Sequence, residues 1–306
     1  MYETFFGLTK KPFSLTPDTG LFVNLPGHER CFALLIHVLE SGEGFLKVVG
    51  EVGTGKTILC RKLLRFLDAD QAEAYHSVYI PNPMLSSVGL YRAVGQELGL
   101  LAEQQNDHDA LLSHITEKIL ALAELNKSVV IVIDEAQSLP AATLEALRLI
   151  TNLETEEKKL VQVILFGQTE LDTLLNEDRF RQLRQRITFA HYLQPLSALE
   201  TGQYIAFRLG QCGYNGPALF SSKAVDLLFR TAHGTPRMIN VIAHKSLMAA
   251  FADQSQEVLP VHIQRAVADG QYGQDTAERA PSLKLASWLT LVATLLFAAA
   301  VYWRLV

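Results

Sequence analysis

The sequence is poor in cysteine, and its cysteines follow no metal-binding or disulfide pattern. Cys31, Cys60 and Cys212 are the 3 cysteines of the 306 residues. They are odd in number, far apart and without C-x-x-C spacing, which argues against a structural zinc site and against a disulfide framework. The pattern favours buried thiols in a reducing compartment.

An excess of basic residues is also lacking. The 27 Lys and Arg are outnumbered by 32 Asp and Glu, which gives a formal net charge of -5. Proteins that work along nucleic acid are usually basic, so the overall charge disfavours that class, although a local basic patch would be compatible with it. Residues 1–13 lack the basic-then-apolar layout of a signal peptide.

Short apolar runs alternate with helical patterns over roughly the first two thirds of the chain. The runs with strand character are Phe45–Val49, Tyr75–Ile80, Val129–Ile133, Val161–Phe166 and Thr188–Leu193. The helical patterns between them are Thr57–Leu67, Leu85–Leu98, Asp109–Leu125, Ala141–Leu153 and Glu170–Arg184. Strands that alternate with helices predict an α/β fold, in which helices cover both faces of a parallel sheet.

The pattern changes after Pro195, where helical segments follow one another without strands. These segments are Leu199–Cys212, Ser222–Ala232, Pro236–Ala252 and Pro260–Ala268. We therefore predict an α/β core over residues 1–195 and a small helical domain, here called the lid, over residues 196–270. Residues 271–284 are rich in Gly, Gln, Asp, Glu and Pro and are predicted to form a linker.

Residues 50–57 fit the phosphate-loop pattern G-x-x-x-x-G-K-[ST] in full. They follow a strand-like run and precede an amphipathic helix, which is the context that gives the motif its meaning. Glycines let the backbone wrap a phosphate, and the amides at the helix start face negative charge. We expect Lys56 to contact the β- and γ-phosphates of ATP and Thr57 to bind Mg²⁺. The predicted nucleotide-binding residues are Gly50, Glu51, Val52, Gly53, Thr54, Gly55, Lys56 and Thr57.

Two acidic residues directly follow the apolar run Val129–Ile133. Asp134, at the carboxyl end of this strand, is placed to hold Mg²⁺ through water. Glu135 is placed to polarise the attacking water as a general base. A solvated turn is the alternative for an isolated Asp-Glu pair, and the phosphate loop makes it the weaker interpretation.

Three further polar residues are candidates for sensing the nucleotide. Gln168 follows the run Val161–Phe166, so its side chain could face the γ-phosphate; an ordinary loop amide is equally consistent with the pattern. Arg237, in the first turn of a predicted lid helix, opposes the helix dipole, which favours a phosphate-binding role. Arg186, just before the last strand, could reach the γ-phosphate of a neighbouring subunit as an arginine finger.

The segment that contains Arg186 carries other arginines, and they cannot all be fingers. Arg179 and Arg181 are interpreted as a solvated helix face, and Arg184 remains open between the two roles.

Together these features resemble the AAA+ superfamily. In its terms, residues 50–57 are Walker A, Val130–Glu135 is Walker B, Gln168 is sensor-1-like, Arg186 finger-like and Arg237 sensor-2-like. Sensor 1 is usually Asn, Ser or Thr in this superfamily, and Gln168 departs from that pattern.

Several segments of the sequence resemble one branch of this superfamily, the general secretion pathway protein A family. The segments that carry this likeness, besides the phosphate loop, are Tyr2–Leu8, Pro12–Asp18, Gly42–Phe45, Cys60-Arg61, Ile133–Gln137, Gly167-Gln168 and Gln185–Ile187. Within the branch, a short chain that ends in an apolar segment is similar to ATPases of MSHA pilus biogenesis. The resemblance, which covers about residues 1–270, implies a homo-oligomeric ATPase that uses ATP and Mg²⁺ in type II secretion or type IV pilus assembly.

An uninterrupted apolar segment, Leu285–Trp303, contains no charged residue. At about 1.5 Å per residue its length as a helix is roughly 28 Å, close to the hydrocarbon thickness of a bilayer. Trp288 and Trp303 lie near its ends, as interfacial aromatics do. We predict a transmembrane helix rather than a buried helix of the globular domain, because the segment is apolar on all faces and follows a polar linker.

The flanking basic residues indicate an orientation for this span. Arg279 and Lys284 precede it and Arg304 follows it, a bias that keeps the N-terminal domain in the cytoplasm. We thus expect a single-pass protein of the bacterial inner membrane.

Two other functions remain open from the sequence. One is a nucleic-acid-associated AAA+ ATPase of the transposition-targeting type, which the acidic balance and the apolar tail disfavour. The other is a nucleotide-gated scaffold with little turnover, which Glu135 disfavours without measuring turnover. The assembly partner, the oligomer size and the use of ATP for force or for a switch are not fixed by the residues.

Overall fold

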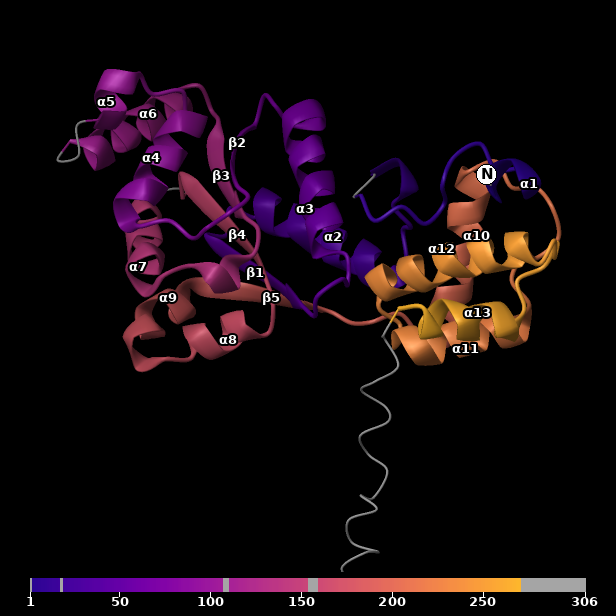
Figure 1. Ribbon diagram of the computed structural model, residues 1–306. Coiled ribbons are helices and arrows are strands. Elements are labelled where there is room, and N and C mark those ends of the chain that lie inside the picture. Colours follow the sequence, from indigo (N-terminus) through magenta and orange to yellow (C-terminus); the bar gives the residue numbers. More distant parts are fainter. Residues whose placement is uncertain (1, 17–18, 107–109, 154–158, 271–306) are drawn as a thin grey trace, which may run out of the picture.

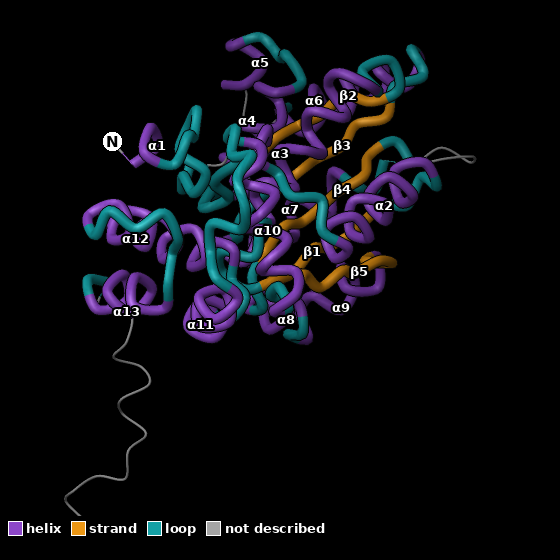
Figure 2. Tube along the Cα trace, turned by 90° about the vertical axis from the view of Figure 1, so that its right-hand side faces the viewer, coloured by secondary structure: helices purple, strands orange, loops and turns teal. Residues whose placement is uncertain are grey.

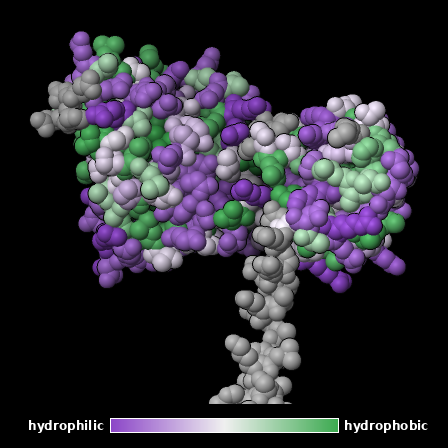
Figure 3. Space-filling model, in the orientation of Figure 1, coloured by the Kyte–Doolittle hydropathy of each residue, from purple (hydrophilic) through white to green (hydrophobic). Residues whose placement is uncertain are grey.

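The computed structural model describes residues 2–16, 19–106, 110–153 and 159–270. Figure 1 shows two lobes, one built around a sheet and one formed by the helices α10 to α13. The outline of the molecule narrows where the two lobes meet (Figure 3).

The sheet has five strands in the order β2-β3-β4-β1-β5, and every neighbouring pair is parallel. Its strands are β1 (Phe45–Gly50), β2 (Tyr75–Ile80), β3 (Ser128–Ile133), β4 (Val161–Gly167) and β5 (Ile187–Leu193). The predicted strands and the parallel α/β fold are thereby confirmed. Strand β4 lies between β1, which leads into the phosphate loop, and β3, which ends before the acidic pair.

Helices cover both faces of the sheet, as Figure 2 shows. On one face α2 (Pro26–Glu40) and α3 (Lys56–Arg65) pack against Leu46, Val130 and Phe166. On the other face, α4 (Ser87–Glu97), α6 (Leu111–Glu124) and α7 (Ala141–Ile150) pack against side chains that include Val49, Ile131 and Leu165. The two faces are apolar because side chains alternate along each strand, so a strand covered on both sides is apolar throughout.

Some predicted helices differ from the observed ones. The pattern Glu170–Arg184, predicted as one helix, forms α8 (Glu170–Leu175) and α9 (Arg181–Arg186), with a 3-10 turn at Asp178–Phe180 between them. The break puts Phe180 in the core, where it is fully buried, and lets the Arg184 guanidinium donate to the Asn176 carbonyl at the end of α8 (3.2 Å). Tertiary packing thus overrides a periodicity that is compatible with one helix.

Other boundaries shift or were not predicted. Helix α3 ends at Arg65 and continues as a π-helical turn, Phe66–Asp70. No range was predicted for α2 or for the short helices α1 (Tyr2–Phe5) and α5 (Ala102–Asn106). Further 3-10 turns lie at Thr19–Leu21 and Ala136–Ser138.

The lid contains α10 (Ala198–Gln211), α11 (Ser222–Ala232), α12 (Pro236–Ala252) and α13 (Pro260–Ala268), close to the predicted ranges. Ser197 and Glu200 form a capping box at the start of α10, and Ser221 caps α11. These caps satisfy amides that a helix start leaves unpaired, so the sequence marks the helix starts locally.

The N-terminal strap, residues 2–16 and 19–25, packs on the lid. Its side chains Tyr2, Phe6 and Phe13 are buried in the same hydrophobic cluster as lid residues such as Ile239. The Tyr2 hydroxyl lies 2.9 Å from His244 Nδ1. The sequence-based partition at residue 195 did not anticipate this contact, because it is made between residues more than two hundred positions apart.

The predicted linker 271–284 and the predicted span 285–303 lie outside the described residues. Among the residues that are described, no helix combines the length and the hydropathy needed to cross a bilayer.

Candidate nucleotide site

The phosphate loop connects β1 to the N-terminus of α3. Gly53 and Gly55 have φ values of 83° and 103°, a region that favours glycine. A Cβ on Gly50 would lie 2.9 Å from the Thr54 hydroxyl, so the loop closes on itself only with glycine there. The loop therefore presents backbone at the positive end of α3, as anion binding requires.

Lys56 is held inside the loop, with a relative exposure of 5%. Its ammonium donates to the carbonyls of Gly50 (2.7 Å) and Glu51 (3.0 Å). Burial lowers the pKa of Lys56, and the nearby carboxylates of Glu135 and Asp134 act in the opposite direction. A cation that is withdrawn from water and fixed beside the loop is well placed to meet phosphate oxygens.

Asp134 directly follows β3 and is 3% exposed. Its carboxylate accepts hydrogen bonds from the Thr57 hydroxyl and from the Glu135 amide, the latter at 3.0 Å. Burial raises the pKa of Asp134, and these hydrogen bonds oppose the rise. A buried carboxylate beside a hydroxyl is an oxygen donor set that suits Mg²⁺, which binds through one or two carboxylates together with substrate phosphates. The predicted roles of Thr57 and Asp134 thus fit their surroundings.

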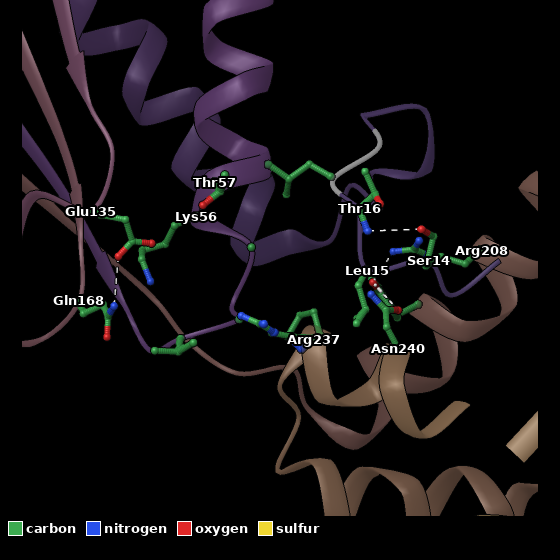
Figure 4. Close-up of a pocket in the computed structure, with 16 residues that line it drawn as sticks. Ser14, Leu15, Thr16, Lys56, Thr57, Glu135, Gln168, Arg208, Arg237 and Asn240 are labelled. Atoms are coloured by element: carbon green, nitrogen blue, oxygen red, sulfur yellow. Dashed lines mark hydrogen bonds between the residues drawn. The ribbon is translucent and has the colours of Figure 1, made fainter. Parts of the chain in front are cut away.

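Glu135 has a φ of 53°, uncommon for a residue with a side chain. Its Oε2 accepts hydrogen bonds from Gln137 Nε2 at 2.6 Å and from Gln168 Nε2 at 3.1 Å (Figure 4). Burial would raise the pKa of Glu135, but these two amides and the charge of Lys56 together lower it. The carboxylate is therefore held ionised and oriented, as a general base must be.

The amide of Gln168 thus contacts the predicted base. Gln168 also lines the pocket, as a residue that senses the γ-phosphate would. The sensing role itself stays a prediction. Gln137 was not predicted as a site residue. Its Oε1 accepts a hydrogen bond from the backbone N–H of Gln168 at 3.0 Å. The sequence Asp-Glu-Ala-Gln places Gln137 two residues after Glu135, and this proximity was the signal that could have identified it as a site residue.

Arg237 enters the site from the lid. Its backbone N–H donates to the Gly53 carbonyl at 3.2 Å, and a Cβ on Gly53 would lie 2.6 Å from the Arg237 Cβ. Figure 4 shows the Arg237 side chain extending from α12 toward the phosphate loop. Arg237 lines the same pocket of about 310 Å³ as Lys56, Thr57 and Glu135. The structure therefore brings the predicted lid arginine to the predicted phosphate site.

The remaining wall of this pocket was not predicted. It is formed by Ser14, Leu15 and Thr16 of the strap and by Tyr204, Arg208 and Asn240 of the lid. The Arg208 guanidinium donates to the Tyr204 hydroxyl at 2.7 Å, and that hydroxyl donates to Asn240 Oδ1 at 3.0 Å. Arg208 also donates to the Pro12 carbonyl at 2.6 Å, which ties the strap to the lid. Ser14, Leu15 and Thr16 lie in the segment Pro12–Asp18 that carries part of the family resemblance, whereas no local motif marks Tyr204, Arg208 or Asn240.

Arg186 is not among the residues that line this pocket. Its guanidinium donates to the Thr151 carbonyl at the end of α7 at 3.4 Å, and its role in a neighbouring subunit stays a prediction. The neighbouring arginines have local partners: Arg184 caps α8, and exposed Arg179 pairs with Glu177 at 2.6 Å.

Residues 38–175 match the family model described as the AAA domain. General secretion pathway protein A of Aeromonas hydrophila is 41% identical over 259 residues, which are 85% of this chain and 46% of that protein. The chain therefore spans less than half the length of this relative.

Solved structures share the fold at low identity. The Cdc6p of Pyrobaculum aerophilum superposes with a TM-score of 0.66 at 18% identity, covering 84% of this chain and 70% of that one. The Aeropyrum pernix ORC1 protein in complex with DNA gives 0.64 at 20% identity, covering 85% and 69%. The RuvB branch migration motor of Thermotoga maritima gives 0.54 at 17% identity, covering 81% and 70%.

The family match, the fold and the geometry of the site agree with one another. This chain carries an AAA domain with the P-loop ATPase fold, and it is related to general secretion pathway protein A.

Proposed function

We propose that this protein is a membrane-tethered AAA+ ATPase that hydrolyses ATP to support assembly of a type II secretion complex or a type IV pilus of the MSHA type. The observation that carries the ATPase part is the convergence of Lys56, Thr57, Glu135 and Arg237 on one pocket, with Asp134 beside Thr57. Each of these residues was predicted separately, and they come from the phosphate loop, the carboxyl end of β3 and the lid.

The chemistry follows from the positions of these side chains. Lys56 and Arg237 approach the pocket from opposite lobes, so each can bind phosphate oxygens from its own side. Thr57 and Asp134 would hold Mg²⁺, which supplies positive charge to the β- and γ-phosphates when bound. Glu135 accepts a proton from the water that attacks the γ-phosphorus, while the bond to the β-phosphate oxygen breaks and ADP leaves.

The substitution Lys56→Ala tests this proposal. It removes the buried ammonium and leaves a cavity where phosphate oxygens would be bound. We expect nucleotide affinity to fall by at least about 100-fold, because charge-assisted hydrogen bonds to phosphate are lost. Titration calorimetry with ATP and with ADP measures the effect. Lys223→Ala, which removes an exposed lysine of α11, is the matched control, and equal binding by both variants would refute the assignment.

The secretion and pilus parts of the proposal have other support. The relative from Aeromonas hydrophila is named for the general secretion pathway. The likeness to the MSHA pilus biogenesis ATPase MshM comes from the apolar segment Leu285–Trp303 that follows the family-like residues 1–270. We place the chain in the general secretion pathway protein A family. We infer that it acts as a homo-oligomer together with pilus or secretion assembly proteins.

We further propose that Leu285–Trp303 anchors the protein in the bacterial inner membrane, with the ATPase domain in the cytoplasm. The segment has the length of one span, carries no charge and has tryptophans near both ends. The basic residues on the N-terminal side of the segment favour a cytoplasmic location of the ATPase domain. The same location is favoured because ATP and Mg²⁺ are supplied in the cytoplasm.

A chain cut after Ser282 is expected to leave the membrane pellet and appear in the soluble fraction. Fractionation after a high-salt wash measures this, with the full chain as control. Retention of the shortened chain in the pellet would contradict the anchor. Digestion of the ATPase domain by protease added outside spheroplasts would show that the orientation is the reverse of the one proposed.

A nucleic-acid-associated ATPase is the second candidate. Two of the similar structures are described as bound to DNA or as a Holliday junction motor, but their identities of 20% and 17% support the fold alone. DNA binding that weakens steeply with salt would favour this alternative.

A further inference from the structure

A histidine outside the nucleotide pocket contacts the phosphate loop from behind. His28 lies in the first turn of α2, three residues after the last residue of the strap, and is 6% exposed. Its Nε2 is 3.0 Å from the carbonyl oxygen of Thr54, and both groups are buried. His28 is therefore a direct link between α2 and the loop.

The contact fixes the protonation of this imidazole. A carbonyl oxygen only accepts hydrogen bonds, so Nε2 must carry the hydrogen. Burial lowers the pKa of His28, the charges of His191 and Lys62 act in the same direction, and the Thr54 carbonyl and Glu200 oppose them. The N-terminal turn of a helix also disfavours a cation. A neutral imidazole that donates from Nε2 follows, and its Nδ1 has no partner among the described residues.

The loop leaves room for this side chain at one residue. A Cβ on Gly55 would lie 2.9 Å from His28 Nε2, closer than such atoms approach. Gly55 thus serves two purposes, because its φ of 103° also requires glycine.

The direction of the Thr54 carbonyl decides the direction of the next amide. The peptide bond between Thr54 and Gly55 is trans, so its carbonyl and its N–H point to opposite sides. With the carbonyl held by His28, the N–H of Gly55 points away from α2. Gly55 lines the nucleotide pocket, whereas Thr54 does not. The imidazole therefore sets the orientation in which this amide can bind a phosphate.

We propose that His28 is a positioning residue for the phosphate loop: it pairs the outward-facing Thr54 carbonyl and thereby keeps the Gly55 amide turned toward the phosphates of the nucleotide. Without a donor at this place the buried carbonyl is unpaired, and the peptide gains by turning toward another partner. This inference rests on the proposed binding of nucleotide by the loop.

The test compares His28→Gln with His28→Met. The two side chains have nearly the same length and volume, and only the glutamine carries an N–H at the position of Nε2. We expect His28→Met to bind ADP and ATP about 5- to 10-fold more weakly than the unsubstituted chain, as the loss of one buried hydrogen bond predicts. His28→Gln is expected to stay within about twofold, because its amide replaces the donor.

Titration calorimetry on the full chain, at a temperature where far-UV circular dichroism shows each variant folded, measures these affinities. The kcat at saturating ATP should change by less than about twofold in both variants, because Glu135 and Asp134 are untouched. A loss of stability alone would not separate the two variants in this way. Should His28→Met not fold, His28→Asn replaces it, because its shorter amide is polar but does not reach the Thr54 carbonyl.

Equal affinities of the glutamine and methionine variants would overturn the inference, and so would unchanged binding by the methionine or asparagine variant. Both outcomes leave the proposed function standing, because they require that the unsubstituted chain binds nucleotide. Failure of the unsubstituted chain to bind ATP or ADP would overturn the inference and the proposed function together.

Discussion

Glu135→Gln is expected to slow ATP hydrolysis by at least about 100-fold while leaving ATP affinity within a few-fold of the original. The glutamine keeps the size of the side chain but cannot accept the proton of the attacking water. It can still pair with Gln137 and Gln168 through its carbonyl oxygen, so the surrounding network survives. The variant should therefore bind ATP and trap it.

Single-turnover hydrolysis and calorimetric binding measure the two quantities. Glu257→Gln, which neutralises an exposed carboxylate of the lid, is the control for the loss of one negative charge. Hydrolysis by the Glu135 variant at the rate of the unsubstituted chain would show that the base is assigned to the wrong residue.

Arg186→Ala is expected to lose about 1000-fold or more of the ATPase rate and to keep its nucleotide affinity as a monomer. An arginine finger in trans contributes effects of this size because it stabilises the charge of the transferring phosphoryl group. The structure leaves Arg186 outside the pocket of its own chain, in a contact with the Thr151 carbonyl that an arriving nucleotide could replace.

Mixing separates a role in trans from a structural one. Arg186→Ala supplies an intact nucleotide site, and Lys56→Ala supplies an intact arginine, so mixed assemblies should recover part of the activity. Arg181→Ala is the matched control, because Arg181 is an exposed arginine of the same helix and should have no effect. Absence of recovery at every mixing ratio would count against the role in trans.

The features that could be predicted from the sequence are those encoded by neighbouring residues. The strands were predicted within one residue at each end because β-branched runs such as Val129–Ile133 are bounded by polar residues. The lid helices were predicted because caps and prolines mark their starts, as Pro236 does for α12. The phosphate loop was found because its geometry depends on consecutive residues.

The features that could not be predicted arise between distant residues. His28 had no motif around it, and its importance appears only where α2 brings it to Thr54. The strap could not be assigned to the lid, since periodicity does not reveal which cluster buries Phe13. The break between α8 and α9 depends on burial of Phe180, which the helical pattern did not contain.

Steady-state release of inorganic phosphate from ATP by the purified full chain tests the central claim most directly. The measurement is made with Mg²⁺, with and without inner-membrane vesicles, beside Lys56→Ala prepared in the same way. The account predicts phosphate release that depends on Mg²⁺ and is lost in the Lys56 variant. Equal phosphate release by both proteins would contradict it. ATP binding with no turnover, both with and without the vesicles, would contradict it as well.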